Sequence, residues 1–301
     1  MTVGLAARLG PAAVGLLLVG ASASGSDIVV DHLPAVPVEG SFVQFAVRPG
    51  SDLAPAGIEG HLAGQPLYFE RDSAGVWRGL GGVPLPVPGE VTLTLTLRYP
   101  DGTQREELVP LPVARGTFAT DQLTVAPRYS ARPDSALAAR IAREQEQAMA
   151  VSRASLDTPR LWQGPFTRPR ASRVTSEFGR AREFNGELQS RHLGLDLAGT
   201  PGAPVRAPNR GVVALVDQTW YGGNVIYLDH GRGLVTAYLH LSAALVSQGD
   251  TVSQGQLIGR VGATGRVTGP HLHWIARYGT LTLDPLSLER LDLSRFGRAG
   301  E

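Results

Sequence analysis

Glycine divides the C-terminal half of the chain into short strand-like runs. From Val174 to about Leu286, apolar residues recur over a few positions at a time, and glycines interrupt these runs repeatedly. Frequent glycine destabilises a helix, whereas tight turns and close backbone approaches need it. Many short strands with glycine turns indicate a compact antiparallel β domain. No long helix is expected between Val174 and Pro270.

The N-terminal third is also expected to be β. Val91–Leu97 alternates apolar residues with Thr throughout, Ser41–Val47 alternates in part, and Tyr99–Gly102 has the composition of a turn. This alternation buries one face of a strand and leaves the other wet, as in a sandwich of two sheets. Residues 24–115 are therefore predicted to form an immunoglobulin-like β-sandwich.

A helical connector is predicted between the two β regions. Pro133-Asp134-Ser135 can cap a helix whose apolar positions run from Leu137 to Ala148. Its apolar stripe is thin, which suits a connecting helix that lies on another domain. The predicted order is a signal peptide at 1–23, an accessory domain at 24–115, a linker with the helix at 116–170, a second β domain at 171–290 and a tail at 291–301.

The first residues have the order of a secretory signal. Arg8 precedes an apolar run from Ala12 to Val19, and Ala21-Ser22-Ala23 offers small residues at a cleavage site. The run is shorter than the ~20 residues that cross a bilayer, so no stable membrane insertion of the mature chain is expected. The alternative is an N-terminal helix of a cytosolic protein. Export predicts a periplasmic or extracellular location, without deciding between them.

Composition removes several kinds of chemistry. All 28 residues in the Lys+Arg count are Arg, and Cys is absent. Schiff-base lysines, P-loop lysines, thiol nucleophiles, disulfides and cysteine zinc sites are thereby excluded. The net charge is +1 and the Arg residues are scattered among acids, so nucleic acid is not an expected partner. Metal or acid–base chemistry would have to use His, Asp, Glu and Tyr.

Histidines gather in three strand-like segments of the second β region. In His192–Leu197 the two-residue period of a strand places His192, Gly194 and Asp196 on one face and three leucines on the other. In the second segment His271 and His273 share a face, opposite Leu272 and Trp274. In the third, His240 shares a face with Tyr238 and Thr236. The glycine between His192 and Asp196 leaves room for something the size of a metal ion.

These residues can supply a catalytic zinc site. Such a site takes three protein ligands and keeps a fourth position for water, and without Cys the ligands must be His and carboxylate. His192, Asp196 and one of His271 or His273 meet this requirement, and the spacing does not decide between the last two. The remaining member of that pair and His240 could then move protons. A closed four-ligand structural site is the alternative.

Residues from about Arg173 to Pro285 resemble the lysostaphin-type, or β-lytic, zinc metallopeptidases, which cleave peptide cross-links of bacterial cell walls. The resemblance is carried, in family order, by Ser176–Gly179, His192–Asp196, Pro204–Ala207, Gly222–Ile226, Asp229–Gly231, Tyr238–Ser242 and Gly265–His273. It covers a little more than a third of the chain. The second β region would thus be a metallopeptidase domain.

The resemblance also assigns residues. It implies one zinc ion bound by His192, Asp196 and His273, with His240 and His271 as the catalytic imidazoles beside a metal-bound water. Asn185 stands where relatives line the groove and is a candidate substrate contact. Some relatives have a Tyr shortly before the first ligand, but this chain has Gln189, Ser190 and Arg191 there. His230 is expected to be structural, and His32 and His61 are expected at the surface or in turns.

The expected function is that of an exported zinc metalloendopeptidase that hydrolyses peptidoglycan cross-links through a metal-activated water. One alternative is a catalytically silent member that binds the wall or activates a wall amidase. Another is an adhesion protein in which the N-terminal sandwich acts. The sequence leaves open whether D-alanyl-diaminopimelate or glycine bridges are cut, whether the connector plugs the groove, and which oligomeric state the protein adopts.

Overall fold

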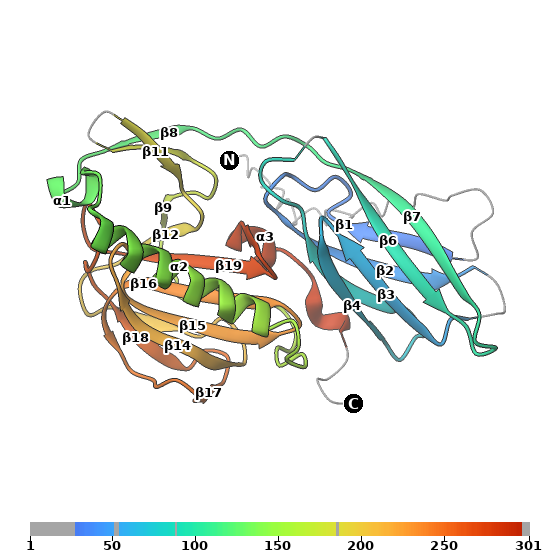
Figure 1. Cartoon of the computed structure of the whole chain (residues 1–301). Helices are drawn as coiled ribbons and strands as arrows, with labels where there is room; N and C mark the ends of the chain where they lie inside the picture. The colour runs from blue at the N-terminus through green and yellow to red at the C-terminus, as the bar shows by residue number, and fades with distance from the viewer. Residues whose placement is uncertain (1–27, 51–53, 88, 185–186, 297–301) are drawn as a thin grey trace, which may run out of the picture.

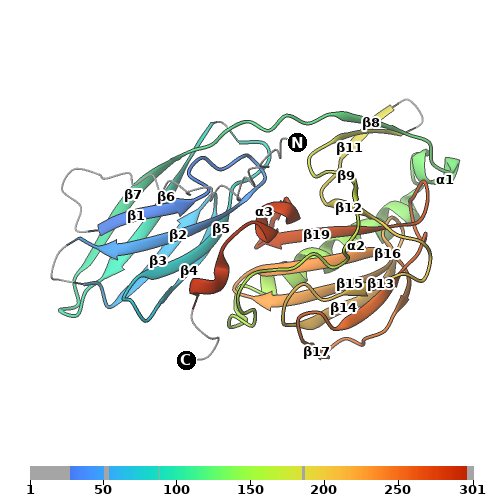
Figure 2. The same cartoon turned by 180° about the vertical axis from the view of Figure 1, so that it is seen from behind.

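The computed structural model describes residues 28–50, 54–87, 89–184 and 187–296. These residues form twenty strands, three α-helices and one 3-10 helix, so the predicted mostly β fold class is confirmed. Two β-rich units lie side by side (Figure 1; Figure 2). The leader-like segment at residues 1–23 lies outside the described residues. No helix among those described has both the length and the apolar character that crossing a membrane requires.

The N-terminal unit contains seven antiparallel strands in the order β1-β2-β5-β4-β3-β6-β7. They are β1 (Ile28–Leu33), β2 (Phe42–Pro49), β3 (Gly57–Leu62), β4 (Gln65–Arg71), β5 (Trp77–Gly82), β6 (Glu90–Arg98) and β7 (Gln104–Pro112). The first half of β4 pairs with β3 and the second half with β5. The strands thus divide into β1-β2-β5-β4 and β3-β6-β7, the strand order of constant-type immunoglobulin sheets. This order agrees with the expected immunoglobulin-like sandwich, which stays a prediction.

Alternation in β6 buries the residues that the sequence pattern selects. Leu93, Leu95 and Leu97 are fully buried, while the Thr residues between them are more exposed. Of the two histidines expected at the surface, His61 is exposed. His32 is buried in β1, contrary to expectation. Its Nδ1 lies 2.9 Å from the Pro34 carbonyl oxygen, and this contact satisfies a polar atom of the buried ring.

The connector contains a strand as well as the expected helix. It comprises β8 (Thr120–Leu123), α1 (Pro127–Ser130) and α2 (Ser135–Ala154). The Asp134 side chain accepts a hydrogen bond from the Leu137 N–H at 2.8 Å, so the predicted cap of α2 is confirmed. Ala148 is buried against Val225 and its neighbours on the second sheet, as a thin apolar stripe requires. β8 was not foreseen, and the predicted domain boundaries stay predictions.

The C-terminal unit is built on a ten-stranded sheet with the central order β17-β14-β15-β16-β19-β12-β9. Its strands are β9 (Val174–Ser176), β12 (Leu195–Ala198), β13 (Pro204–Arg206), β14 (Gly211–Thr219), β15 (Gly223–Gly231), β16 (Leu234–Ala244), β17 (Thr251–Val252), β18 (Leu257–Val261), β19 (His271–Tyr278) and β20 (Leu281–Leu283). A smaller sheet contains β11 (Glu187–Arg191), β10 (Ala181–Phe184) and β8, in that order. The last described elements are α3 (Pro285–Glu289) and the 3-10 helix η1 (Leu293–Arg295). The described residues between Val174 and Pro270 contain no helix, as predicted.

The two units share one hydrophobic core. Leu283 of β20 packs so closely on β5 that a Cβ at Gly82 would lie 2.2 Å from it. The Tyr278 hydroxyl donates to the Pro66 carbonyl oxygen at 2.9 Å. The segment expected to be a tail differs from that expectation, since Leu293 and Phe296 are buried in this shared core. The apolar side chains of this segment pack on a surface formed by both units, and the sequence alone does not reveal that surface.

His230 is a fully buried polar residue of β15. Its Nδ1 lies 2.7 Å from the Arg210 carbonyl oxygen, and because a carbonyl only accepts, Nδ1 carries the proton. Its Nε2 then accepts from the Thr236 hydroxyl at 2.8 Å. Burial lowers the pKa of His230 to about 4. The expectation of a structural role agrees with these contacts.

His230 should make the folded state sensitive to acid. The unfolded chain takes up this proton near pH 6.5 and the folded chain only near pH 4, so stability is complete above pH 6.5 and falls between the two values. The loss should total about 3 kcal/mol. Between these pH values, the free energy of unfolding measured with urea should change by about 3 kcal/mol less for His230→Gln than for the unmodified protein. His61→Gln, on an exposed position of β3, is the matched control, and equal slopes for all three proteins would contradict the assignment.

Candidate metal centre and groove

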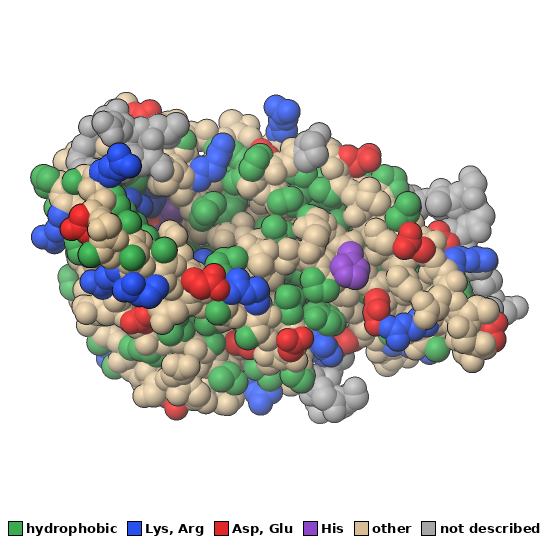
Figure 3. All heavy atoms as spheres, in the orientation of Figure 1, with side chains coloured by type: hydrophobic (Ala, Val, Ile, Leu, Met, Phe, Trp, Pro, Cys, Tyr) green, Lys and Arg blue, Asp and Glu red, His purple; other side chains and the backbone are tan. Residues whose placement is uncertain are grey.

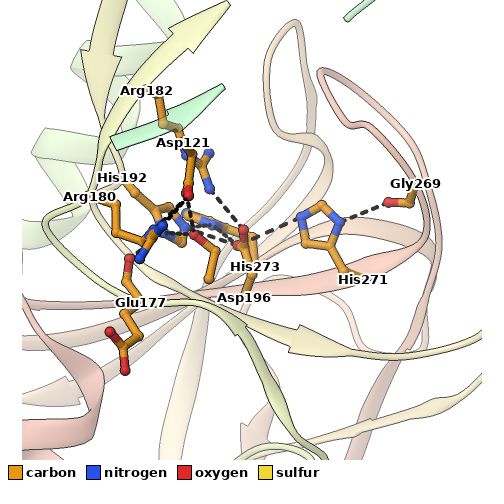
Figure 4. A network of polar contacts seen from close by, with 10 residues as sticks. Asp121, Glu177, Arg180, Arg182, His192, Asp196, Gly269, His271 and His273 are labelled. Atoms are coloured by element: carbon orange, nitrogen blue, oxygen red, sulfur yellow. Dashed lines mark hydrogen bonds and ion pairs between the residues drawn. The ribbon is translucent and has the colours of Figure 1, made fainter. Parts of the chain in front are cut away.

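Three buried side chains converge in the C-terminal unit (Figure 4). His192 Nε2 lies 3.0 Å from Asp196 Oδ1 and 3.0 Å from His273 Nδ1. His273 Nδ1 lies 2.7 Å from the same Asp196 oxygen. The exposed fractions are 1% for His192, 6% for Asp196 and 7% for His273. One nitrogen from each ring and one carboxylate oxygen therefore form a group that could hold a metal ion.

The pairing of β12 with β19 positions two of the three. Asp196 stands directly opposite His273 in this antiparallel ladder. Leu272 and Trp274 alternate with His273 and are fully buried on the other face, as predicted. The register thus presents a carboxylate and an imidazole side by side.

His192 reaches the group by a different route from the predicted one. A single strand over His192–Leu197 was expected, but β11 ends at Arg191 and β12 begins at Leu195. Leu193, expected on the buried face, is 42% exposed. A Cβ at Gly194 would lie 2.6 Å from the ring of His273. The glycine therefore makes room for a ligand ring as the chain bends between strands.

Neighbouring groups orient the candidate ligands. His192 Nδ1 lies 2.7 Å from the Glu177 carbonyl oxygen, so it carries the proton and leaves the Nε2 lone pair for a metal. Arg182 Nη2 donates to Asp196 Oδ2 at 2.8 Å, which leaves Oδ1 facing the two rings. Such contacts around a metal ligand fix its rotation and tautomer.

Ionisation also favours metal binding. Burial opposes the charge on Asp196, but its close contacts with the rings of His192 and His273 outweigh burial and hold the pKa of Asp196 well below its usual range. Burial lowers the pKa of His273 to about 4. At neutral pH the carboxylate is charged and this imidazole is neutral, which are the forms that coordinate metals.

Two further imidazoles lie beside the group. The His240 ring centre is 4.9 Å from that of His271 and 5.8 Å from that of His273. His271 Nε2 lies 3.7 Å from Asp196 Oδ1, and its Nδ1 donates to the Gly269 carbonyl oxygen at 2.8 Å. His240 Nδ1 donates to the Thr264 carbonyl oxygen at 2.9 Å. Burial, reinforced by His273 and His271, lowers the pKa of His240, so it is neutral at pH 7.

His240 occupies a β-bulge in β16. Leu239 and His240 together face the single residue Val225 of β15, and the φ of His240 is +63°. A non-glycine residue in this left-handed region costs about 1–3 kcal/mol and is often found at functional sites. Simple alternation would have kept His240 in line with Tyr238, which is buried in the core. His240 lines a cavity instead.

The cavity adjoins the metal-ligand group and has a volume of about 280 Å³. Asp196, His240 and His271 line it from the C-terminal unit. Asp121 and Leu123 line it from β8, which pairs in parallel with β10. Among the described residues, the connector makes no hydrogen bond or ion pair with the three candidate ligands. It forms a wall of the cavity.

The structure thus gathers all five residues that the sequence selected for chemistry. Asn185, the candidate substrate contact, lies outside the described residues. Sequence reasoning did not find Asp121, which reaches His192 through Ser176: the Ser176 hydroxyl donates to Asp121 Oδ2 at 2.9 Å and lies 3.1 Å from His192 Nδ1. No local pattern marks Asp121, because its partners come from a distant segment.

A buried His–Asp–His group at the edge of a cavity is the kind of site that metallopeptidases use. Residues 190–285 match the profile of peptidase family M23. The catalytic domain of lysostaphin from Staphylococcus simulans is 31% identical, with 93% of that chain and 40% of this one covered and a TM-score of 0.36. The chain therefore belongs to peptidase family M23, and the resemblance to lysostaphin-type peptidases is confirmed.

Two further comparisons concern extent. The peptidoglycan DD-endopeptidase ShyC of Vibrio cholerae is 39% identical over 119 residues, which are 39% of this chain and 27% of ShyC. The chain thus matches about a quarter of the length of that relative. An M23-type protein from Pseudomonas aeruginosa has 27% identity and a TM-score of 0.65, covering 84% of this chain and 95% of its own. This similarity extends beyond the metallopeptidase domain.

Gly194→Ala should weaken metal binding. The added methyl group would lie 2.6 Å from the His273 ring and 2.8 Å from the Trp274 carbonyl oxygen, so His273 must move. We expect Zn²⁺ affinity, measured by competition with a chelating dye, to fall about tenfold or more. Gly57→Ala is the matched control, since a Cβ there meets nothing within 4 Å. Unchanged affinity in Gly194→Ala would show that His273 is not a ligand.

Proposed function

We propose that this protein is an exported zinc metalloendopeptidase that hydrolyses peptide bonds in bacterial peptidoglycan. The observation that carries the proposal is the convergence of His192, Asp196 and His273 beside two further imidazoles at a cavity. Family membership supports the peptidase activity, and the name of ShyC as a peptidoglycan DD-endopeptidase supports the substrate. Export, predicted from the leader-like segment at residues 1–23, would bring the protein to that substrate.

The donor set fits zinc. Two imidazole nitrogens and one carboxylate oxygen are ligands that catalytic zinc sites use, and the chain has no Cys to compete. His192, Asp196 and His273 would hold the ion. A bound Zn²⁺ supplies a Lewis acid that polarises a carbonyl group and lowers the pKa of a coordinated water to about 7.

His240 and His271 would move protons and stabilise charge. Both rings donate Nδ1–H to a backbone carbonyl oxygen, which fixes the tautomer and leaves Nε2 as the acceptor. His240, neutral at pH 7, can take a proton from the attacking water and return it to the departing amine. His271 lies on the Asp196 side of the cavity. Once Nε2 has taken up a proton, its N–H can donate a hydrogen bond to the oxyanion that develops on the scissile carbonyl.

Zinc-dependent digestion of cell walls tests the proposal. Purified peptidoglycan incubated with the zinc-loaded protein should acquire new amine termini. Chelated protein and His273→Ala should yield none above background, because each lacks the complete metal site. If the unmodified, zinc-loaded protein sediments with the wall but releases no amine, it is a binding protein and the proposal is wrong.

His240→Gln should separate proton transfer from metal binding. Loss of a general base lowers kcat by about 10²–10⁴-fold. The zinc content should stay at one per chain, because His240 is not a proposed ligand. His61→Gln, in the exposed part of β3, is the control and should retain full activity. An unchanged kcat in His240→Gln would remove this residue from the reaction.

A further inference from the structure

Arg266 lines the same cavity as Asp196, His240 and His271. Its guanidinium carbon lies 4.3 Å from the ring centre of Phe184 and 4.2 Å from that of Tyr221. Its backbone N–H donates to the Tyr221 carbonyl oxygen at 2.9 Å. Two aromatic rings thus hold the charged group in place by cation–π attraction.

The acids that line the cavity already have other partners. Asp196 accepts from Arg182, and Asp121 accepts from Arg180 at 2.7 Å. Within the described part of the chain, no carboxylate forms an ion pair with Arg266, and no hydrogen bond uses its side chain. Arg182 is close enough for the two positive charges to repel each other, and burial together with this repulsion lowers the pKa of Arg266. Arg266 is therefore a cation held beside the reaction site without a described acidic partner.

The charge of the cavity favours an anionic ligand. Elsewhere, acidic and basic side chains are mixed over the visible face (Figure 3). In the cavity, Arg266 adds a positive charge that the two acids do not offset, and a divalent ion at the proposed metal site would add to it. A guanidinium matches a carboxylate with two parallel N–H donors, which makes an acidic peptide the fitting ligand.

We propose that Arg266 binds a free carboxylate on the substrate residue next to the scissile bond. A D-alanyl-diaminopimelate cross-link carries such a carboxylate beside its amide nitrogen, whereas a glycine bridge does not. Arg266 would then select the acidic cross-link, as a specificity residue of the same groove. This inference rests on the proposed function.

Two cross-linked peptides that differ only at this carboxylate test the proposal, one with the free acid and one with its amide. The unmodified protein should cleave the acid with the higher kcat/KM. Arg266→Gln should lose about thirty-fold on the acid, equivalent to about 2 kcal/mol, and stay within about threefold on the amide. Arg266→Lys keeps the charge but not the two parallel N–H donors, so its kcat/KM on the acid should lie between those of the unmodified protein and Arg266→Gln. An equal loss on both peptides would overturn the proposal.

The control and a binding measurement separate this inference from the proposed function. Arg206→Gln, at an exposed position of β13 in the same domain, should not alter the preference. Chelator-treated protein should bind the acid more tightly than the amide by fluorescence anisotropy, and Arg266→Gln should abolish the difference. Cleavage of neither peptide by zinc-loaded protein would defeat the proposed function alone. Equal binding of acid and amide, or faster cleavage of a pentaglycine bridge than of the acid, would defeat the role of Arg266.

Discussion

The register between β12 and β19 is the constraint on which the site depends. It places Asp196 opposite His273 although the two are 77 residues apart in the chain. A slip by one residue would turn every side chain of a strand to the other face. Trp274 and Leu272, fully buried, oppose such a slip because it would move them out of the core. Core packing on one face of β19 thereby fixes metal-ligand geometry on the other.

Periodicity predicted the parts of the site that lie in regular strands. His273 alternates with buried residues as expected, and the buried leucines of β6 follow the same rule. It failed at His192 and His240, where the backbone is irregular. The bulge at His240 depends on β15 and on Gly262, whose added Cβ would lie 2.7 Å from the His240 carbonyl oxygen. Such irregularities arise from partner strands, so the local sequence does not reveal them.

Long-range pairings account for the rest of what sequence could not predict. β8 belongs to the connector, yet it pairs with β10 and brings Asp121 within reach of Ser176 and hence of His192. Phe296 likewise packs into a core that also contains residues of the N-terminal unit, starting with Ile28 of β1. The ring centre of Phe296 lies 4.9 Å from that of Trp162. A four-residue strand and a short apolar terminus have no distinctive local pattern. Both acquire their structure from surfaces that only the folded chain provides.

Arg182 helps a buried carboxylate and neutral imidazoles to coexist in this site. A buried charge must be paired or hydrogen-bonded, and a carboxylate among imidazoles alone would tend to draw a proton onto one of them. The permanent charge of Arg182 satisfies one Asp196 oxygen instead. Burial is the largest cause that lowers the pKa of His273, and Asp196 opposes it. The charge of Arg182 adds a smaller lowering effect. Arg182 thus adds to the effect of the two imidazoles on Asp196 and to the effect of burial on His273, which together leave the carboxylate ionised and the imidazole nitrogen free for a metal ion.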